Sequence, residues 1–358
     1  SGLDVIPIPT FAAATAALRR LAVITGGPGT GKTATVVRVL ALLIELAGLT
    51  GGPVPRVALV APTGKAAARL SESIRDAQVA EGPRALGCGA EVLEAIPLEA
   101  STVHRLLGWR PRTPTRFRYD HANPLPVDVL VVDEASMLDL SLFAKLLSAV
   151  PRAARVILLG DRDQLASVEA GSVLADICGG GRDYDRGEAF TRDLEAVCGV
   201  SLGLDGGASS APLSPGLAEA LVDLRYSYRF AERGAVGNLA EAIRRGDADR
   251  VMSLLEAGRD HPAGGVSLCL VQGIDALEAE VQAIALHGYA PYMSATASGA
   301  PLQERLARFD GFRVLSALRR GRSGSEQIAA RLAAGLAAAF ELDARARWYP
   351  GQAVMVRA

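Results

Sequence analysis

Hydrophobic runs alternate with helical patterns through the first half of the chain. Four runs have the length of strands buried on both faces: 21–25, 57–61, 127–132 and 156–159. Helical patterns follow the first three runs, ending at Gly48, beginning at Lys65 and covering 139–150. This alternation predicts an α/β fold in which helices cover both faces of a parallel sheet.

The pattern changes after residue 230. Helices are expected at 235–245, 249–257, 276–286 and 327–340, and strands at 312–317 and 352–357. We therefore predict a first domain of residues 1–223 and an incomplete second domain of residues 224–358.

Composition narrows the class of protein. A hydrophobic content of 49% can form large cores, and a net charge of −1 excludes a generally basic surface but allows a local basic groove. The four cysteines form no C-x-x-C pair, which fits a reduced, cytoplasmic chain without a metal framework. The longest apolar stretch, 36–49, contains Arg38 and Glu45, so we expect no membrane contact and see no signal peptide.

The first run leads into the sequence GGPGTGKT, a G-x-x-x-x-G-K-[ST] pattern between a predicted strand and a predicted helix. Its residues are Gly26, Gly27, Pro28, Gly29, Thr30, Gly31, Lys32 and Thr33. The backbone N–H groups would cradle phosphates, Lys32 would reach the β- and γ-phosphates, and Thr33 would ligate Mg²⁺. A glycine-rich turn without a ligand is the alternative, but it leaves the flanking strand and helix unexplained. Lys32 is also one of only three lysines in the chain.

Polar residues follow two further runs. Asp133 and Glu134 end the third run, where Asp133 would hold Mg²⁺ through water and Glu134 would act as general base on the attacking water. The alternative is that both acids only cap the next helix. Gln164 follows the fourth run, and its neutral amide could bond a γ-phosphate and then release it; the alternative is a turn residue without a ligand.

Several blocks in order carry a family resemblance: GGPGTGKT, LVAPTGKAAARL, STVHRLLG, VLVVDEASMLD, LLGDRDQLASVEAGSVLADIC and LRYSYRF. Together they resemble superfamily 1 DNA helicases of the 5′-to-3′ branch, and more closely the RecD family, the alpha subunits of bacterial exonuclease V (RecBCD). The similarity runs from about residue 21 to 357. It implies a P-loop NTPase with a RecA-like sheet, part of a second RecA-like domain, ATP and Mg²⁺ as cofactors, and a role in DNA repair and recombination.

The resemblance also implies residue roles. Residues 26–33 would bind the nucleotide, Asp133 and Glu134 would serve metal and water, Gln164 would sense the γ-phosphate, and Arg229 would reach that phosphate from the second domain. A structural arginine near a hinge is the alternative for Arg229.

Single-stranded DNA and RecB-like and RecC-like subunits are the implied partners. The DNA contacts would come from Pro62, Thr63 and Lys65 and from a segment containing Thr102, His104 and Arg105. His104 taken alone is more often a packing residue than a DNA ligand. A candidate DNA-contacting hairpin, which could also be a solvated surface hairpin, contains Arg112, Arg116, Phe117, Arg118 and Tyr119.

The sequence departs from the family in three respects. A partner-docking domain before the nucleotide loop, an adenine-reading glutamine in residues 7–20, and the later motor blocks are missing from it. We therefore expect a piece of a longer motor protein that binds nucleotide weakly and unwinds nothing alone. A stand-alone RecD-like helicase and a nucleotide-binding scaffold remain alternatives. A small-molecule kinase does not fit the Asp133–Glu134 pair, and no separate carboxylate cluster supports nuclease activity.

Overall fold

The computed structural model describes residues 8–109, 117–164, 173–179, 186–199, 215–224, 234–260, 265–342 and 348–352. Contacts divide the chain into two compact units, the first formed by Ser1–Leu255 with Ala263–Val266 and the second by Glu256–Pro262 with Ser267–Ala358. The first unit thus extends past residue 223, where we predicted the first domain to end. The predicted boundary of the motor domains stays a prediction, since compactness alone does not define it.

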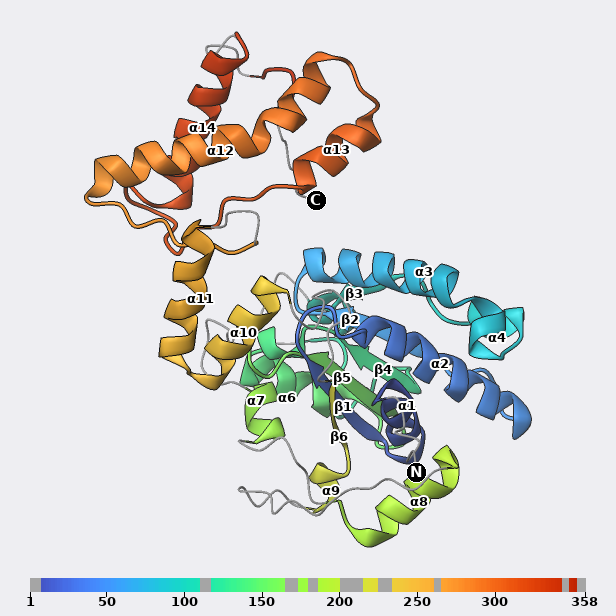
Figure 1. Cartoon of the computed structure of the whole chain (residues 1–358). Coiled ribbons are helices and arrows are strands. Elements are labelled where there is room, and N and C mark those ends of the chain that lie inside the picture. The colour runs from blue at the N-terminus through green and yellow to red at the C-terminus, as the bar shows by residue number, and fades with distance from the viewer. Residues whose placement is uncertain are drawn as a thin grey trace. The chain divides into compact units, whose positions relative to one another are not determined.

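The first unit contains a six-stranded sheet in which every pairing is parallel. Its strands are β1 (Leu21–Gly26), β2 (Val57–Ala61), β3 (Ala100–Thr102), β4 (Val129–Val132), β5 (Arg155–Gly160) and β6 (Leu221–Leu224). The spatial order is β3-β2-β4-β5-β1-β6 (Figure 1). The α/β prediction is confirmed, and the four predicted runs are β1, β2, β4 and β5.

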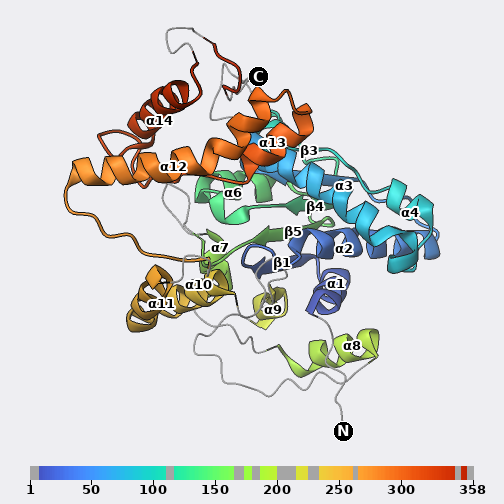
Figure 2. The ribbon, with the colours of Figure 1, turned by 45° about the horizontal axis from the view of Figure 1, so that its top comes forward.

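Helices precede, connect and follow these strands. They are α1 (Ile8–Leu18), α2 (Lys32–Leu49), α3 (Gly64–Leu86), α4 (Ala90–Glu94), α5 (Val103–Leu106), α6 (Leu140–Ala149), α7 (Val173–Cys178), α8 (Glu188–Cys198), α9 (Pro215–Ala218), α10 (Ala235–Arg245) and α11 (Ala248–Asp260). The predicted helices of this part match α2, α3, α6, α10 and α11 closely. In Figure 2, α1 and α2 lie on one side of the strands and α6 lies on the other.

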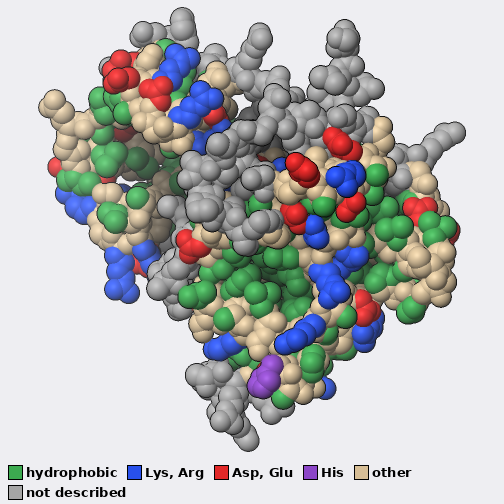
Figure 3. Space-filling view, turned by 90° about the horizontal axis from the view of Figure 1, so that it is seen from below, with side chains coloured by type: hydrophobic (Ala, Val, Ile, Leu, Met, Phe, Trp, Pro, Cys, Tyr) green, Lys and Arg blue, Asp and Glu red, His purple; other side chains and the backbone are tan. Residues whose placement is uncertain are grey.

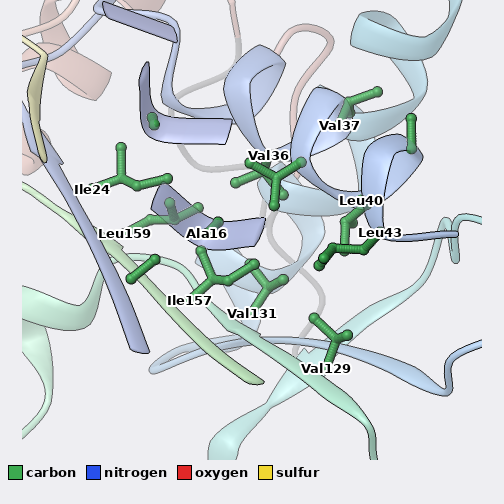
Figure 4. Close-up of a cluster of buried hydrophobic side chains, with 14 of the residues drawn as sticks. Ala16, Ile24, Val36, Val37, Leu40, Leu43, Val129, Val131, Ile157 and Leu159 are labelled. Carbon is green, nitrogen blue, oxygen red and sulfur yellow. The ribbon is translucent and has the colours of Figure 1, made fainter. Parts of the chain in front are cut away.

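Two hydrophobic cores result from strict alternation along the strands. In β4, Val129 and Val131 face the core formed with α1, α2 and α3, whereas Leu130 and Val132 face the core formed with α6. Figure 4 shows the first core, with Val36 of α2 directed toward the strands. Because each fully buried Val, Leu or Ile contributes roughly 1.5–3 kcal/mol, these two layers fix where the strand ends lie.

The second unit is helical in the residues that the structure describes. Its helices are α12 (Ile274–Ala297), α13 (Leu302–Asp310) and α14 (Ser325–Ala339), and both α13 and α14 pack on α12. Tyr289 of α12 stacks on Phe309 and meets Phe312 edge-on, with ring centroids 5.9 Å and 5.1 Å apart. A Cβ on Gly288 would lie 2.5 Å from the Phe312 ring, so only glycine permits this approach.

The predicted strand at 312–317 is wrong, because these residues form an irregular segment. The hydroxyl of Ser316 lies 2.9 Å from the carbonyl oxygen of Leu318 and 2.8 Å from that of Ser323, which turns the segment back toward α14. Leu315 is 92% exposed, so the apolar letters are not buried as a central strand would require. The strand predicted at 352–357 lies almost wholly outside the described residues.

Hydrophobic side chains also reach the surface, and they gather on the face seen in Figure 3. Leu49, Leu140 and Val79 are among the large exposed ones. None of the described helices combines the length and the apolar character that a membrane span needs.

Candidate nucleotide and nucleic-acid site

The carboxyl ends of all six strands lie along one edge of the sheet, because every pairing is parallel. The predicted nucleotide loop follows β1, Gln164 follows β5, and Asp133 follows β4, and these three strands are adjacent. The predicted DNA residues follow β2 and β3, which continue the sheet beyond β4. The edge therefore has a β4-β5-β1 half with the nucleotide candidates and a β3-β2 half with the DNA candidates.

The loop between β1 and α2 has the backbone that its glycines predict. Gly29 and Gly31 adopt φ values of 76° and 81°, in the left-handed region that favours glycine. The N–H of Thr35 donates to the carbonyl oxygen of Gly31 at 2.9 Å, which begins α2 directly after the loop. A Cβ on Gly26 would lie 2.8 Å from the carbonyl oxygen of Leu224, so this glycine lets β6 pack against the start of the loop.

Lys32 lies at the first position of α2, and Thr33 follows it. The Lys32 ammonium donates to the carbonyl oxygens of Gly26 at 2.6 Å and Gly27 at 3.1 Å. The Thr30 hydroxyl donates to Gly27 at 2.9 Å. The ammonium is therefore held over the loop, at a helix N-terminus whose N–H groups favour anions.

Asp133 and Glu134 follow β4 in an unusual environment. Burial is the main cause that raises the pKa of Asp133 to about 6; the nearby Glu134 carboxylate raises it further, whereas the Glu134 N–H and the charge of Lys32 lower it. Glu134 adopts a left-handed backbone, with φ 50° and ψ 40°, and starts the 3₁₀ turn Ala135–Met137. A β-carbon in this region is strained, which is a feature that clusters at functional sites.

The β3-β2 half places its candidates at two helix starts. The Thr63 hydroxyl accepts from the N–H of Ala66 at 3.2 Å at the start of α3, and the Thr102 hydroxyl accepts from the N–H of Arg105 at 3.2 Å at the start of α5. Lys65 is exposed beside Thr63, and Pro62 is half-buried. Ala61 and Thr102 are register partners, so the two candidate segments lie next to each other.

His104 is exposed, and its ring lies beside another aromatic ring. Its ring lies 5.9 Å from the ring of Phe117, and the Lys145 ammonium lies 5.6 Å from the Phe117 ring centre. The DNA role of His104 stays a prediction. Of the candidate hairpin, Arg112 and Arg116 fall outside the described residues, as does Arg229.

Comparison with known proteins follows this geometry. An AAA domain matches residues 10–170. The RecBCD enzyme subunit RecD of Mycolicibacterium smegmatis is 40% identical over 354 residues, which cover 97% of this chain and 53% of the relative. The RecBCD enzyme subunit RecD of Mycobacterium tuberculosis is 40% identical over 341 residues, covering 94% and 50%. This chain belongs to the RecD family.

The match to RecD proteins is longer than that to a related helicase. The ATP-dependent RecD2 DNA helicase of Deinococcus radiodurans is 45% identical over 152 residues, covering 42% of this chain and 17% of that protein. Among solved structures, Bacteroides sp. Pif1 in complex with ADP-AlF4 is 20% identical, with a TM-score of 0.36 over 71% of this chain and 50% of that one, too low to support an argument. The chain spans about half the length of the RecD relatives that it matches.

The structure adds two residues of this RecD-family chain that we did not predict. Asp161 follows β5, and burial is the main cause that raises its pKa, while the charge of Lys32 lowers it. Ser136 is 5% exposed and donates to Oε1 of Gln164 at 3.0 Å. The signals were present, since Asp161 lies in the GDRDQ block and Ser136 in the DEAS block. A sequence block indicates which segment belongs to the site, whereas the hydrogen bond between two blocks can be found only from the folded structure.

Proposed function

We propose that this chain is the ATP-binding part of a 5′-to-3′ DNA helicase and translocase, and that the whole protein is the motor subunit of a RecBCD-type helicase–nuclease in double-strand break repair and recombination. One observation carries the proposal: the nucleotide loop, the Asp133–Glu134 pair and Gln164 follow three adjacent strands at one edge. Ligands of open α/β sheets bind at this edge. The RecD family membership supplies the class of motor.

ATP and Mg²⁺ are the proposed cofactors. The loop N–H groups and Lys32 would hold the phosphates, and Thr33 with Asp133 would hold the metal. The donor set fits a hard cation, because Asp133 is a half-buried carboxyl beside a second carboxylate, and carboxylate oxygens are ligands that Mg²⁺ prefers. Mg²⁺ would supply charge neutralisation of the transferred phosphoryl group.

Glu134 is the proposed general base. It lies two residues after the end of β4, directly after Asp133, and its backbone is left-handed. Gln164 would donate to the γ-phosphate, and Arg229 would add a cation from residues outside the described ranges. Each of these groups acts on charge that develops during phosphoryl transfer.

Single-stranded DNA is the proposed ligand of the β3-β2 half, through Pro62, Thr63, Lys65, Thr102 and His104. Because β4 lies between β2 and β5, it is the shared neighbour of the DNA candidates and the nucleotide candidates. A displacement of β4 on hydrolysis would therefore act on both halves.

RecB-like and RecC-like subunits are the proposed protein partners. The match to RecD over 97% of this chain, against 42% for RecD2, favours this assembly over a stand-alone helicase. Co-expression with RecB-like and RecC-like subunits tests it. Recovery of a complex is expected, and failure to form one, together with unwinding by the chain alone, would favour the stand-alone alternative.

Nucleotide binding tests the ATP site. Calorimetry with Mg·AMP-PNP should detect binding by the chain. This binding should be lost when Mg²⁺ is chelated, and it should also be lost in the Lys32→Ala variant. Binding that is indifferent to both changes would contradict the proposal.

DNA binding is tested separately, by fluorescence anisotropy with a labelled oligothymidylate. Lys65→Ala should weaken binding, and it should also flatten the salt dependence because one phosphate contact is lost. Arg152→Ala removes an exposed positive charge just before β5, at the amino edge, and should leave binding unchanged. Equal effects of the two exchanges would indicate charge attraction without a defined site.

A further inference from the structure

The Gln164 side chain of the candidate site is hydrogen-bonded at one end by a residue to which no motif assigns a role. The hydroxyl of Ser136 donates to Oε1 of Gln164 at 3.0 Å. Ser136 lies in the 3₁₀ turn Ala135–Met137, two residues after Glu134, and is 5% exposed. Gln164 itself is exposed. The bond therefore anchors an exposed amide to a buried hydroxyl.

This bond decides which end of the amide remains available. A glutamine amide has an acceptor end, Oε1, and a donor end, the Nε2 amino group. Ser136 donates to Oε1, and within the described ranges no residue bonds Nε2, so the donor end of Gln164 remains available there. Phosphate oxygens accept hydrogen bonds, so only the donor end suits a γ-phosphate. A flipped amide would present its oxygen to phosphate oxygens and be repelled.

The backbone around Gln164 is also hydrogen-bonded to neighbouring segments of the candidate site. Its N–H donates to the carbonyl oxygen of Asp161 at 3.2 Å. The N–H of Arg162 donates to the hydroxyl of Thr25 at 3.2 Å, and Thr25 is fully buried at the end of β1, just before the nucleotide loop. The turn is thus fixed to β1 and β5 through its backbone, whereas the link of the Gln164 side chain to the Glu134 segment is the Ser136 hydroxyl.

We propose that Ser136 is a positioning residue that orients the Gln164 amide, so that Nε2 reads the γ-phosphate while the same bond ties the sensor to the segment of the general base. This inference rests on the proposed ATP site. It assigns Ser136 no contact with nucleotide. Loss of the hydroxyl frees the amide to rotate, so only part of the population presents a donor.

A buried serine that only fills space is the competing explanation, and Ser71 provides a matched control. Ser71 is 9% exposed, and its hydroxyl accepts from the N–H of Ala100 at 2.8 Å and donates to the carbonyl oxygen of Ala67 at 3.2 Å. Ser71→Ala removes a buried hydroxyl of the same kind in the first unit. It should lower the unfolding midpoint without changing recognition of the γ-phosphate.

The experiment measures, for the 358-residue chain, the ratio of the dissociation constants for Mg·ADP and Mg·AMP-PNP. Ser136→Ala should reduce the preference for Mg·AMP-PNP by roughly two- to tenfold, the range of one neutral hydrogen bond, and leave the affinity for Mg·ADP unchanged. Gln164→Ala should produce a similar or larger loss. The double variant should equal Gln164→Ala, because Ser136 acts through that side chain.

The outcomes separate the two proposals. Wild-type chain that binds neither nucleotide, or a Lys32→Ala chain that binds both normally, overturns the ATP site and this inference with it. If Lys32→Ala and Gln164→Ala behave as expected but Ser136→Ala keeps the wild-type ratio, only the positioning role is overturned. Additive losses in the double variant also overturn it, since they would mean that Ser136 acts independently of Gln164.

Discussion

The amino and carboxyl edges of the sheet differ in the surroundings of their carboxylates, and the pKa values shift in opposite directions. At the amino edge, Arg56 bonds Asp128 with both Nε and Nη2, each at 2.9 Å, and the guanidinium lowers the pKa of Asp128 to about 2. At the carboxyl edge, Asp133 lies beside Glu134 in a half-buried position, and burial of its carboxyl raises its pKa to about 6. One edge satisfies its carboxylate within the chain, whereas the other leaves two carboxylates together.

The backbone follows the same division. Glu134 is left-handed at the carboxyl edge. Arg56 and Asp128 at the amino edge exchange ordinary bonds, the N–H of Arg56 to Oδ2 of Asp128 at 2.8 Å and the N–H of Asp128 to the carbonyl oxygen of Arg56 at 2.9 Å. The amino edge thus holds an ion pair that contributes to stability, whereas the carboxyl edge holds the two carboxylates that we propose to serve Mg²⁺ and the attacking water. Four predictions can break or sharpen this contrast.

The largest effect is expected at Lys32. Its replacement by alanine removes the cation over the loop, and affinity for Mg·ADP should fall roughly thirtyfold or more, as for loss of one partner of a buried charge contact. Calorimetry measures the change. Lys145→Ala, a lysine exchange on α6, is the control and should keep wild-type affinity; a matching loss there would show that the effect is not specific to the loop.

Asp133→Asn should stabilise the metal-free chain. The folded pKa of Asp133, about 6, lies above its ordinary value of about 3.9, so charging this carboxyl lowers stability as pH rises through that window. The gain in free energy of unfolding should be about 1–3 kcal/mol at pH 7.5 and should vanish near pH 4. Urea unfolding at the two pH values measures it, and lower stability of the variant at pH 7.5 would contradict the prediction.

Glu134→Gly should be more stable than Glu134→Ala by about 1 kcal/mol, because only glycine adopts the left-handed backbone without strain. Both variants lose the carboxylate, so their difference isolates the backbone. Glu72, exposed in α3, provides the reverse control: there glycine should be the less stable replacement. Equal stabilities of the two Glu134 variants would argue against strain at this position.

The smallest effect is expected at the amino edge. Asp128→Asn should lower stability only slightly at pH 7, because the pair is exposed and solvent screens it. The folded pKa is depressed, so the contribution is present above about pH 4 and is lost as pH falls toward 2. Thermal unfolding from pH 2 to 7 measures the trend. A trend like that of Asp133 would remove the contrast between the edges.

The sequence predicted the parts of the site that lie on long or patterned segments. The runs that became β1, β2, β4 and β5, and the glycine loop, have local signals that suffice. The strands β3 and β6 have three and four residues, and pairing with β2 and β1 is what defines them. The segment 312–317 has a strand-like residue pattern, but hydrogen bonds of the Ser316 hydroxyl to nearby carbonyl oxygens determine its conformation.

Tertiary contacts also explain the site residues that we missed. The bond from Ser136 to Gln164 joins residues 28 positions apart, which no local pattern encodes. The raised pKa of Asp161 comes mainly from burial at the end of β5. The sequence blocks therefore located the segments that form the candidate site, and the order of the strands in the sheet determined which of their residues come together.

Gly26 has a consequence for tolerance to mutation. It is both the first residue of the phosphate loop and the register partner of Leu224 in β6. A methyl group there would lie 2.7 Å from the Thr30 hydroxyl and 2.9 Å from the Leu224 Cβ. Even alanine would press on the loop from one side and on the edge strand from the other. The strand leads within five residues to Arg229. A single glycine thus sets the spacing between β1 and β6, two strands that the sequence separates by about two hundred residues.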